Sequence, residues 1–154
     1  MLVQLEEFET PKKIFTEYAY FSSYSKTWLK HAEEYVNKMT KKFNLNSEHL
    51  VIEIASNDGY LLQYFKKYKI PVLGIEPAHE IAKNATKSGI ETLPEFFTSK
   101  LADEIRNKYG SARIITINNL FANIDNLDDI IDGVCRLLSP DGVFIIESSY
   151  LGDM

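Results

Sequence analysis

Two acidic side chains stand near the ends of predicted strands, where they could bind a small polar ligand. Glu53 lies near the end of the apolar run 49–55, and Glu76 directly follows a second apolar run, 71–75. Between them the stretch 55–59, ASNDG, is small, polar and closed by a glycine, which is typical of a tight turn before a helix. Carboxylates form strong hydrogen bonds with ammonium and hydroxyl groups. The pattern therefore predicts a ligand site around one turn and two acidic strand ends.

The turn also discriminates between the nucleotides that such a site could bind. A pyrophosphate site normally has the pattern G-x-G-x-x-G, because glycines let the backbone approach the anion at a helix amino terminus. This turn keeps only Gly59, and Glu53 and Asp58 would place negative charge beside a phosphate. An adenosine that carries a cationic amino group and a sulfonium suits two carboxylates better than a dinucleotide does.

The rest of the chain supplies the elements that would position this site. Apolar and β-branched runs predict further strands, and helical periodicity predicts helices between them. The predicted strands are 49–55, 71–75, 90–93, 112–117 and 143–147, and the predicted helices are 25–43, 78–88, 98–109 and 127–138, with another opening at Tyr60. This alternation predicts an α/β fold whose mostly parallel sheet is flanked by helices. Ligands of such sheets bind beyond the carboxyl ends of the strands.

Composition limits the class of partner. The 154 residues carry a formal net charge of −5, and no basic stripe of the kind that binds nucleic acid appears in the main body. No apolar run is long enough to span a membrane. The single cysteine, Cys135, cannot form an internal disulfide, and we expect it to be a small buried apolar residue. We expect a cytoplasmic protein with a small-molecule substrate, without nucleic-acid, membrane or metal partners.

Residues 1–46 differ in character from the rest of the chain. They contain an aromatic-rich arm and then an amphipathic helix, which Ser25 can cap and whose apolar stripe includes Trp28. We therefore divide the chain into 1–46, an arm and a helix that packs on the core, and 47–154, a ligand-binding domain.

Several of these stretches together resemble a known family. The segments EYAYFSSYSKTWLKHA, EIASNDGYLL, GIEPA, INNLFANI and GVFIIE are similar to those of the sugar C-methyltransferases, which methylate nucleotide-linked keto-deoxysugars. These enzymes are class I S-adenosylmethionine-dependent methyltransferases with a Rossmann-like fold. The E-x-A-x-N-x-G turn departs from the common acidic-x-Gly-x-Gly-x-Gly form at Ala55 and Asn57.

The resemblance implies roles for individual residues. The turn that starts at Glu53 would hold the methionine part of the cofactor, and Glu76 would accept hydrogen bonds from the ribose. Phe96 and Phe97 would pack near the adenine. The implied S-adenosylmethionine-binding set is Glu53, Ala55, Ser56, Asn57, Asp58, Gly59, Glu76, Pro77, Phe96, Phe97, Asn118, Asn119 and Leu120.

A catalytic base is not evident in the sequence. The resemblance makes Tyr18 and Tyr20 candidate substrate contacts, and Asn123 stands where family members usually have a histidine. The family's catalytic Glu-His dipeptide and its zinc module have no counterpart here. The histidines at 31, 49 and 79 lie beside predicted helix or strand starts, and we expect surface or capping roles for them, away from the carboxyl edge of the sheet.

The last predicted strand raises a further expectation. The resemblance predicts a strand order of 3-2-1-4-5 with the family's last strands missing, which leaves the apolar run VFIIE at an edge. We expect that the chain is part of a longer enzyme, or that another chain covers this edge. That other chain includes a second copy of this one, which would self-associate through the fifth strand. The alternatives to a methyltransferase are a non-catalytic module that binds S-adenosylmethionine or S-adenosylhomocysteine and, more distantly, an NAD-dependent oxidoreductase domain.

Overall fold

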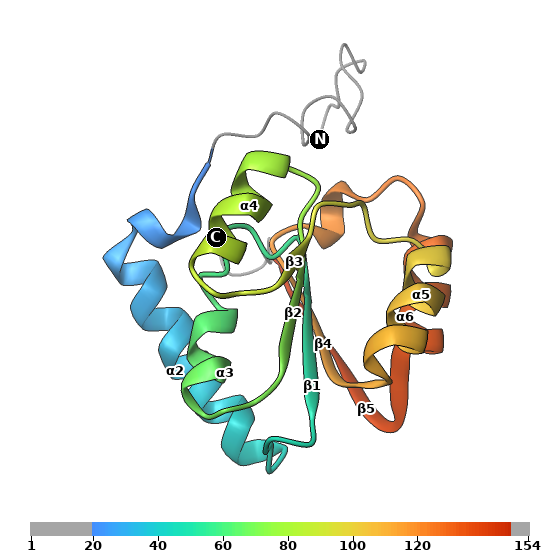
Figure 1. Ribbon diagram of the computed structural model, residues 1–154, viewed down its shortest axis with the longest axis horizontal. Helices are drawn as coiled ribbons and strands as arrows, with labels where there is room; N and C mark the ends of the chain where they lie inside the picture. The colour runs from blue at the N-terminus through green and yellow to red at the C-terminus, as the bar shows by residue number, and fades with distance from the viewer. Residues whose placement is uncertain (1–19, 149–154) are drawn as a thin grey trace, which may run out of the picture.

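The computed structural model describes residues 20–148, which form a parallel sheet between two layers of helices (Figure 1). Its strands are β1 (Leu50–Ile54), β2 (Val72–Ile75), β3 (Thr92–Leu93), β4 (Ala112–Asn118) and β5 (Leu138–Glu147). They pair in the order β3-β2-β1-β4-β5, and every pair is parallel. The predicted fold class and strand order are therefore confirmed.

The helices are divided between the two faces of the sheet. They are η1 (Ser22–Tyr24), α2 (Lys26–Lys42), α3 (Leu62–Lys67), α4 (His79–Lys87), α5 (Ser99–Tyr109), η2 (Phe121–Asn123) and α6 (Leu127–Leu137). In Figure 1, α2, α3 and α4 lie on one side of the sheet, and α5 and α6 lie on the other. Because each crossover carries a helix, the strand ends that bear the predicted site gather at one edge.

Alternation along the strands gives each face its own core. Ile52 and Ile54 of β1 pack with Leu101 and Val134 from the α5 and α6 layer. Val51 packs with Phe65 and the residues of α2 and α3. Because neighbouring strand residues point to opposite faces, Glu53 shares the face of Val51 and is directed toward the α2 and α3 layer.

Local sequence signals explain where several helices begin and end. The Ser25 hydroxyl accepts a hydrogen bond from the Trp28 N–H, as predicted, and the Thr98 hydroxyl accepts one from the Leu101 N–H. Gly110 follows α5 with a φ of 84°, the left-handed region that favours glycine at a helix end.

Three expectations about local structure are wrong. Strand β5 begins at Leu138 rather than at Val143, and the pairing register shifts between Ala112–Leu138 and Ile114–Val143, so the residues 139–142 between them bulge from the ladder. Helix α3 begins at Leu62 rather than at Tyr60. Cys135 is exposed, because it falls on the outer side of α6 while Val134 and Leu137 face the core.

Two features are absent from residues 20–148. None of the helices described is both long and apolar enough to cross a membrane. Within the same residues, no group of three or more His, Cys, Asp or Glu side chains is arranged to hold a metal ion.

Candidate functional site

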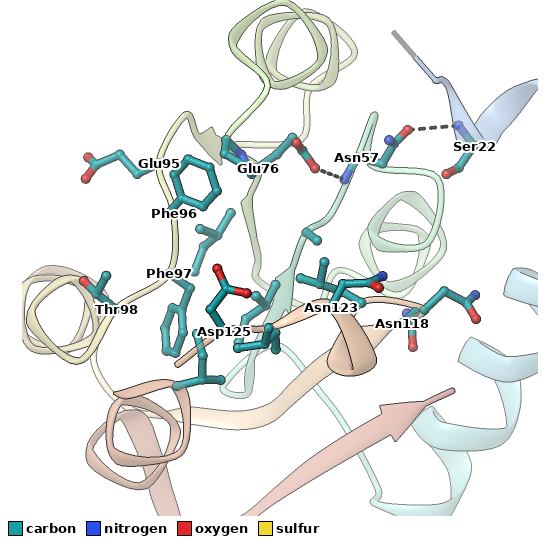
Figure 2. A pocket seen from close by; sticks show the side chains of 18 of the residues that line it. Ser22, Asn57, Glu76, Glu95, Phe96, Phe97, Thr98, Asn118, Asn123 and Asp125 are labelled. Carbon is teal, nitrogen blue, oxygen red and sulfur yellow. Dashed lines mark hydrogen bonds between the residues drawn. The ribbon is translucent and has the colours of Figure 1, made fainter. Parts of the chain in front are cut away.

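A cavity of about 720 Å³ opens at the carboxyl ends of β1, β2 and β4 (Figure 2). This volume lies within the range of small-molecule sites. Its walls come from the segment before α2, the strand ends, the β3–α5 loop and the loop between β4 and α6. The lining residues are Tyr20, Ser22, Trp28, Ile54, Ala55, Asn57, Tyr60, Ile75, Glu76, Pro77, Glu95, Phe96, Phe97, Thr98, Asn118, Asn119, Leu120, Asn123, Ile124, Asp125, Asn126, Asp129 and Ile130.

Glu76 forms a polar part of this wall. It is 5% exposed, and its two carboxylate oxygens accept hydrogen bonds from backbone N–H groups, Oε2 from Asn57 at 3.0 Å and Oε1 from Ala78 at 2.9 Å. Burial raises the pKa of Glu76, and the two backbone donors oppose that rise. Each carboxylate oxygen can accept a second hydrogen bond, so Glu76 can bind two neighbouring hydroxyl groups from the cavity.

The turn after β1 has positive φ angles, including at the two positions where the common motif has glycine and this chain does not. Ala55 has a φ of 56°, Asn57 a φ of 49°, and Gly59 a φ of 79°. The left-handed region is costly for alanine and more readily adopted by asparagine. The E-x-A-x-N-x-G sequence therefore forms a tight turn despite its two missing glycines, with strain concentrated at Ala55.

Asn57 and Asp58 fasten the segment before α2 to this turn. The Asn57 side chain accepts a hydrogen bond from the Ser22 N–H and donates one to the Tyr20 carbonyl, both at 2.9 Å. Asp58 Oδ2 accepts a hydrogen bond from the Ser23 N–H at 3.2 Å. Because Tyr20 and Ser22 line the cavity, these two side chains hold one of its walls in place.

Behind the β4 end of the cavity lies a buried polar network. Asn118 Nδ2 donates to Glu53 Oε1 at 3.0 Å, and the Thr116 hydroxyl donates to Asn118 Oδ1 at 3.2 Å. Tyr60 also contacts Asn118, with its hydroxyl 3.5 Å from Asn118 Nδ2. The network fixes the orientation of Asn118 at the cavity wall.

Glu53 itself is fully buried, and burial raises its pKa well above the ordinary value. Its second oxygen, Oε2, has no hydrogen-bond partner among residues 20–148. Because Glu53 lies behind the cavity wall, it reaches the site through Asn118, to which its Oε1 is bonded. Glu76, by contrast, offers its remaining acceptor positions directly to a ligand hydroxyl pair.

The apolar part of the wall comes from the β3–α5 loop. Phe97 is 6% exposed and belongs to the core beneath the cavity, where its ring packs against Gly133 of α6. Phe96 is 39% exposed, and both rings line the cavity (Figure 2). Phe96 is therefore the ring with free surface for stacking on a planar ligand, while Phe97 supports the wall.

The structure brings most of the sequence-predicted site together. Glu53, Ser56, Asp58 and Gly59 lie outside the cavity wall; Ser56 packs against Gly74, and Gly59 faces Ile90. Tyr18 lies outside the described residues. The predicted residues that line the cavity are Ala55, Asn57, Glu76, Pro77, Phe96, Phe97, Asn118, Asn119, Leu120, Tyr20 and Asn123.

Sequence reasoning missed several lining residues. Trp28 and Tyr60 stack on each other with ring centroids 6.0 Å apart, and both reach the cavity although the pattern assigned them to helix packing. Asp125 and Asp129 also line it, and Figure 2 shows the Asp125 side chain among the lining residues. Their position in the loop and helix after β4, at the carboxyl edge of the sheet, was the signal that could have found them.

One expectation about histidines is wrong. His31 reaches the carboxyl edge of the sheet, because it contacts Glu147, the last residue of β5. Its Nε2 lies 3.1 Å from Glu147 Oε2. No local pattern indicates this contact, since more than a hundred positions separate the two residues.

Comparison with known proteins places the chain in a family. Residues 26–152 match the family model described as a methyltransferase domain. The chain belongs to that family. It is 32% identical over 153 residues to C-methyltransferase NovU of Streptomyces niveus, and the match covers 99% of this chain and 36% of NovU. This chain thus spans little more than a third of the length of this curated relative.

Solved structures show the same fold. A SAM-dependent methyltransferase from Archaeoglobus fulgidus aligns with a TM-score of 0.65 and 13% identity, over 80% of this chain and 54% of that one. A SAM-dependent methyltransferase from Thiobacillus denitrificans, solved with S-adenosyl-L-homocysteine, gives a TM-score of 0.57 and 13% identity over 73% and 47% of the two chains. The predicted resemblance to class I S-adenosylmethionine-dependent methyltransferases is confirmed, and S-adenosylmethionine is the cofactor of this family, as predicted.

Proposed function

We propose that this methyltransferase domain binds S-adenosylmethionine in the cavity at the strand ends and takes part in methylation of a carbon atom next to a keto group, on a nucleotide-linked sugar. The observation that carries the proposal is Glu76. It is a buried carboxylate on the cavity wall, oriented by the N–H groups of Asn57 and Ala78 so that its remaining acceptor positions suit a ribose diol.

The other residues fit the remaining parts of the cofactor. Phe96 and Leu120 offer apolar surface for the adenine, and Asn57, Asn118 and Asn119 surround the opposite end, where the methionine part would lie. Glu53 supports that end through Asn118 rather than from the cavity wall. When bound, S-adenosylmethionine supplies an electrophilic methyl group.

The acceptor is proposed from the similarity to NovU, which is named a C-methyltransferase. Methylation at carbon requires removal of a proton next to a carbonyl and stabilisation of the resulting enolate.

Three further predictions remain proposals: the division of the chain at residue 46, the small-molecule partner and the cytoplasmic location. The five strands described hold the cofactor cavity, and the methyl acceptor would approach at its open side.

Calorimetric titration tests the cofactor assignment. We expect S-adenosylmethionine and S-adenosylhomocysteine to bind this chain and NAD not to bind, because the turn after β1 offers no pyrophosphate site. Binding of NAD alone would overturn the proposal. A parallel titration of Phe96→Ala, which removes the stacking surface but leaves Glu76 in place, should weaken both adenosine ligands.

The alternative is a module that binds the cofactor without turnover. Asn123 favours it, because this residue lines the cavity at a position where the sugar C-methyltransferases usually have a histidine. Incubation with a thymidine-diphosphate-linked 4-keto-6-deoxyglucose and S-adenosylmethionine, followed by mass spectrometry, separates the two. A methylated product supports the enzyme, and binding of S-adenosylmethionine without any product supports the module.

A further inference from the structure

Asp125 presents a carboxylate to the cofactor cavity that no other side chain or backbone group among residues 20–148 binds. It lies in the loop between η2 and α6, immediately before Asn126, whose side chain caps α6 by accepting a hydrogen bond from the Asp129 N–H. Figure 2 shows the Asp125 carboxylate directed into the cavity. The cap fixes the backbone next to Asp125, and both of its carboxylate oxygens remain available to a ligand.

Two loops are joined at this end of the cavity. Ser99, the first residue of α5, donates two hydrogen bonds to Asp129 Oδ1, from its backbone N–H at 3.2 Å and from its hydroxyl at 2.5 Å. Phe97 and Ile130, which line the cavity, belong to the same core cluster. The β3–α5 loop and the start of α6 therefore form one continuous wall, and Asp125 stands on it.

The orientation of the cofactor places its base against this wall. If Glu76 holds the ribose at the end of β2, and the methionine part lies at Asn57 and Asn118, the base must extend the other way, past β2 toward the β3–α5 loop. Phe96 offers its stacking surface on that loop. The rim of a planar ring placed there faces the loop that carries Asp125.

We propose that Asp125 selects adenine by accepting a hydrogen bond from its exocyclic amino group, an inference that rests on the proposed cofactor binding. An ionised carboxylate can only accept hydrogen bonds. It therefore pairs with a 6-amino purine, whereas a 6-oxo purine would bring a second acceptor against it. A site built for one hydrogen-bonding pattern rejects the other, because polar groups are left unpaired when the wrong ligand binds.

The other oxygen acceptors at this end are less suited to the role. Asp129 already accepts two hydrogen bonds from Ser99 through the same oxygen, and the Thr98 hydroxyl caps α5. Glu95 lines the cavity, but Figure 2 shows its side chain directed away from the centre of the site. Asp125 is therefore the carboxylate at this end that both faces the cavity and has its two oxygens available.

Calorimetric titration with two ligands that differ only at this position of the base tests the inference. They are S-adenosyl-L-homocysteine and its 6-oxo analogue, S-inosyl-L-homocysteine. We expect the wild-type chain to bind the adenosyl ligand about 10-fold or more tightly than the inosyl ligand, because one hydrogen bond to a charged acceptor is lost.

Asp125→Asn should remove this preference from both sides. The amide keeps the size of the side chain but can donate an N–H to the 6-oxo group, so the inosyl ligand should bind more tightly than it does to wild type. The adenosyl ligand should bind more weakly. Tighter binding of one ligand cannot result from damage to the fold, so this gain distinguishes base selection from a structural role of Asp125.

Two further variants serve as controls. Asp128→Asn makes the same change at an exposed residue in the first turn of α6 that does not line the cavity, and it should keep the wild-type preference. Glu95→Gln should also keep it. Loss of the preference in Glu95→Gln, together with its retention in Asp125→Asn, would assign base selection to Glu95 and overturn the inference.

The wild-type titrations separate failure of this inference from failure of the proposed function. If wild type binds both ligands equally, or Asp125→Asn keeps the wild-type preference, Asp125 does not select the base, and the cofactor site stands. If wild type binds neither ligand, the cofactor proposal fails, and the role of Asp125 falls with it.

Discussion

The carboxylate of Glu76 accepts a hydrogen bond from the backbone N–H of Asn57 at 3.0 Å, and this bond joins the end of β2 to the turn after β1. Asn57 in turn binds the backbone of Tyr20 and Ser22 through its side chain. A single chain of hydrogen bonds thus runs from the proposed ribose site to the segment before α2, which forms one wall of the cavity. The geometry of the cofactor site and the position of that segment depend on the same two residues.

Replacement of Glu76 by alanine should weaken S-adenosylhomocysteine binding by about 1 to 3 kcal/mol, because hydrogen bonds to a charged acceptor are lost. Calorimetric titration measures the change. Glu80→Ala, an exposed carboxylate on α4, is the matched control and should leave affinity unchanged. Equal affinity for wild type and Glu76→Ala would contradict the ribose role.

Glu53 should make stability fall as pH rises. Its pKa in the folded protein is raised well above the ordinary 4.5, so above that value the unfolded chain releases a proton that the folded chain keeps. The free energy of unfolding therefore declines from about pH 4.5 up to the raised pKa and then levels off. Glu53→Gln lacks this titration, so its stability relative to wild type should increase over the same range in urea unfolding at several pH values. Parallel curves for the two proteins would show that Glu53 does not cause the decline.

Ala55→Gly should stabilise the fold by about 1 kcal/mol, because glycine adopts the observed φ of 56° without the steric cost that alanine has there. The same substitution at Ala82, inside α4, should instead destabilise by about 1 kcal/mol or more, since glycine disfavours helix. Thermal and urea unfolding compare the two. Destabilisation at both positions would mean that Ala55 carries no strain.

We predict that the chain self-associates through β5, because this strand lies at the edge of the sheet. β5 pairs with β4 on one side only among the strands described, and Ile146 is 43% exposed on it. Unpaired edges with apolar side chains favour strand pairing between chains. We expect concentration-dependent dimerisation in sedimentation velocity, abolished by Ile146→Lys. Tyr68→Lys, at another exposed large side chain but at the end of α3, should dimerise as wild type does.

Local sequence determined the fold and the edge at which the site lies. Alternating apolar strands and amphipathic helices require a parallel sheet, and parallel strands must present their carboxyl ends together. That reasoning correctly located Glu76, Phe96 and the loop that begins at Asn118, because each lies at or just after the end of a strand. It worked because strand ends and helix caps depend on neighbouring residues in the chain.

Only the tertiary structure decided which side chains face the cavity and which face the core behind it. Glu53 precedes the turn as the sequence predicts, yet the alternation of β1 directs it toward α2 and α3, so it acts through Asn118. Trp28 and His31 belong to a helix whose surface pattern says nothing about the sheet edge beside it, and β5 brings Glu147 to His31. Contacts between residues so distant in the chain depend on how whole elements pack, which no short stretch of sequence encodes.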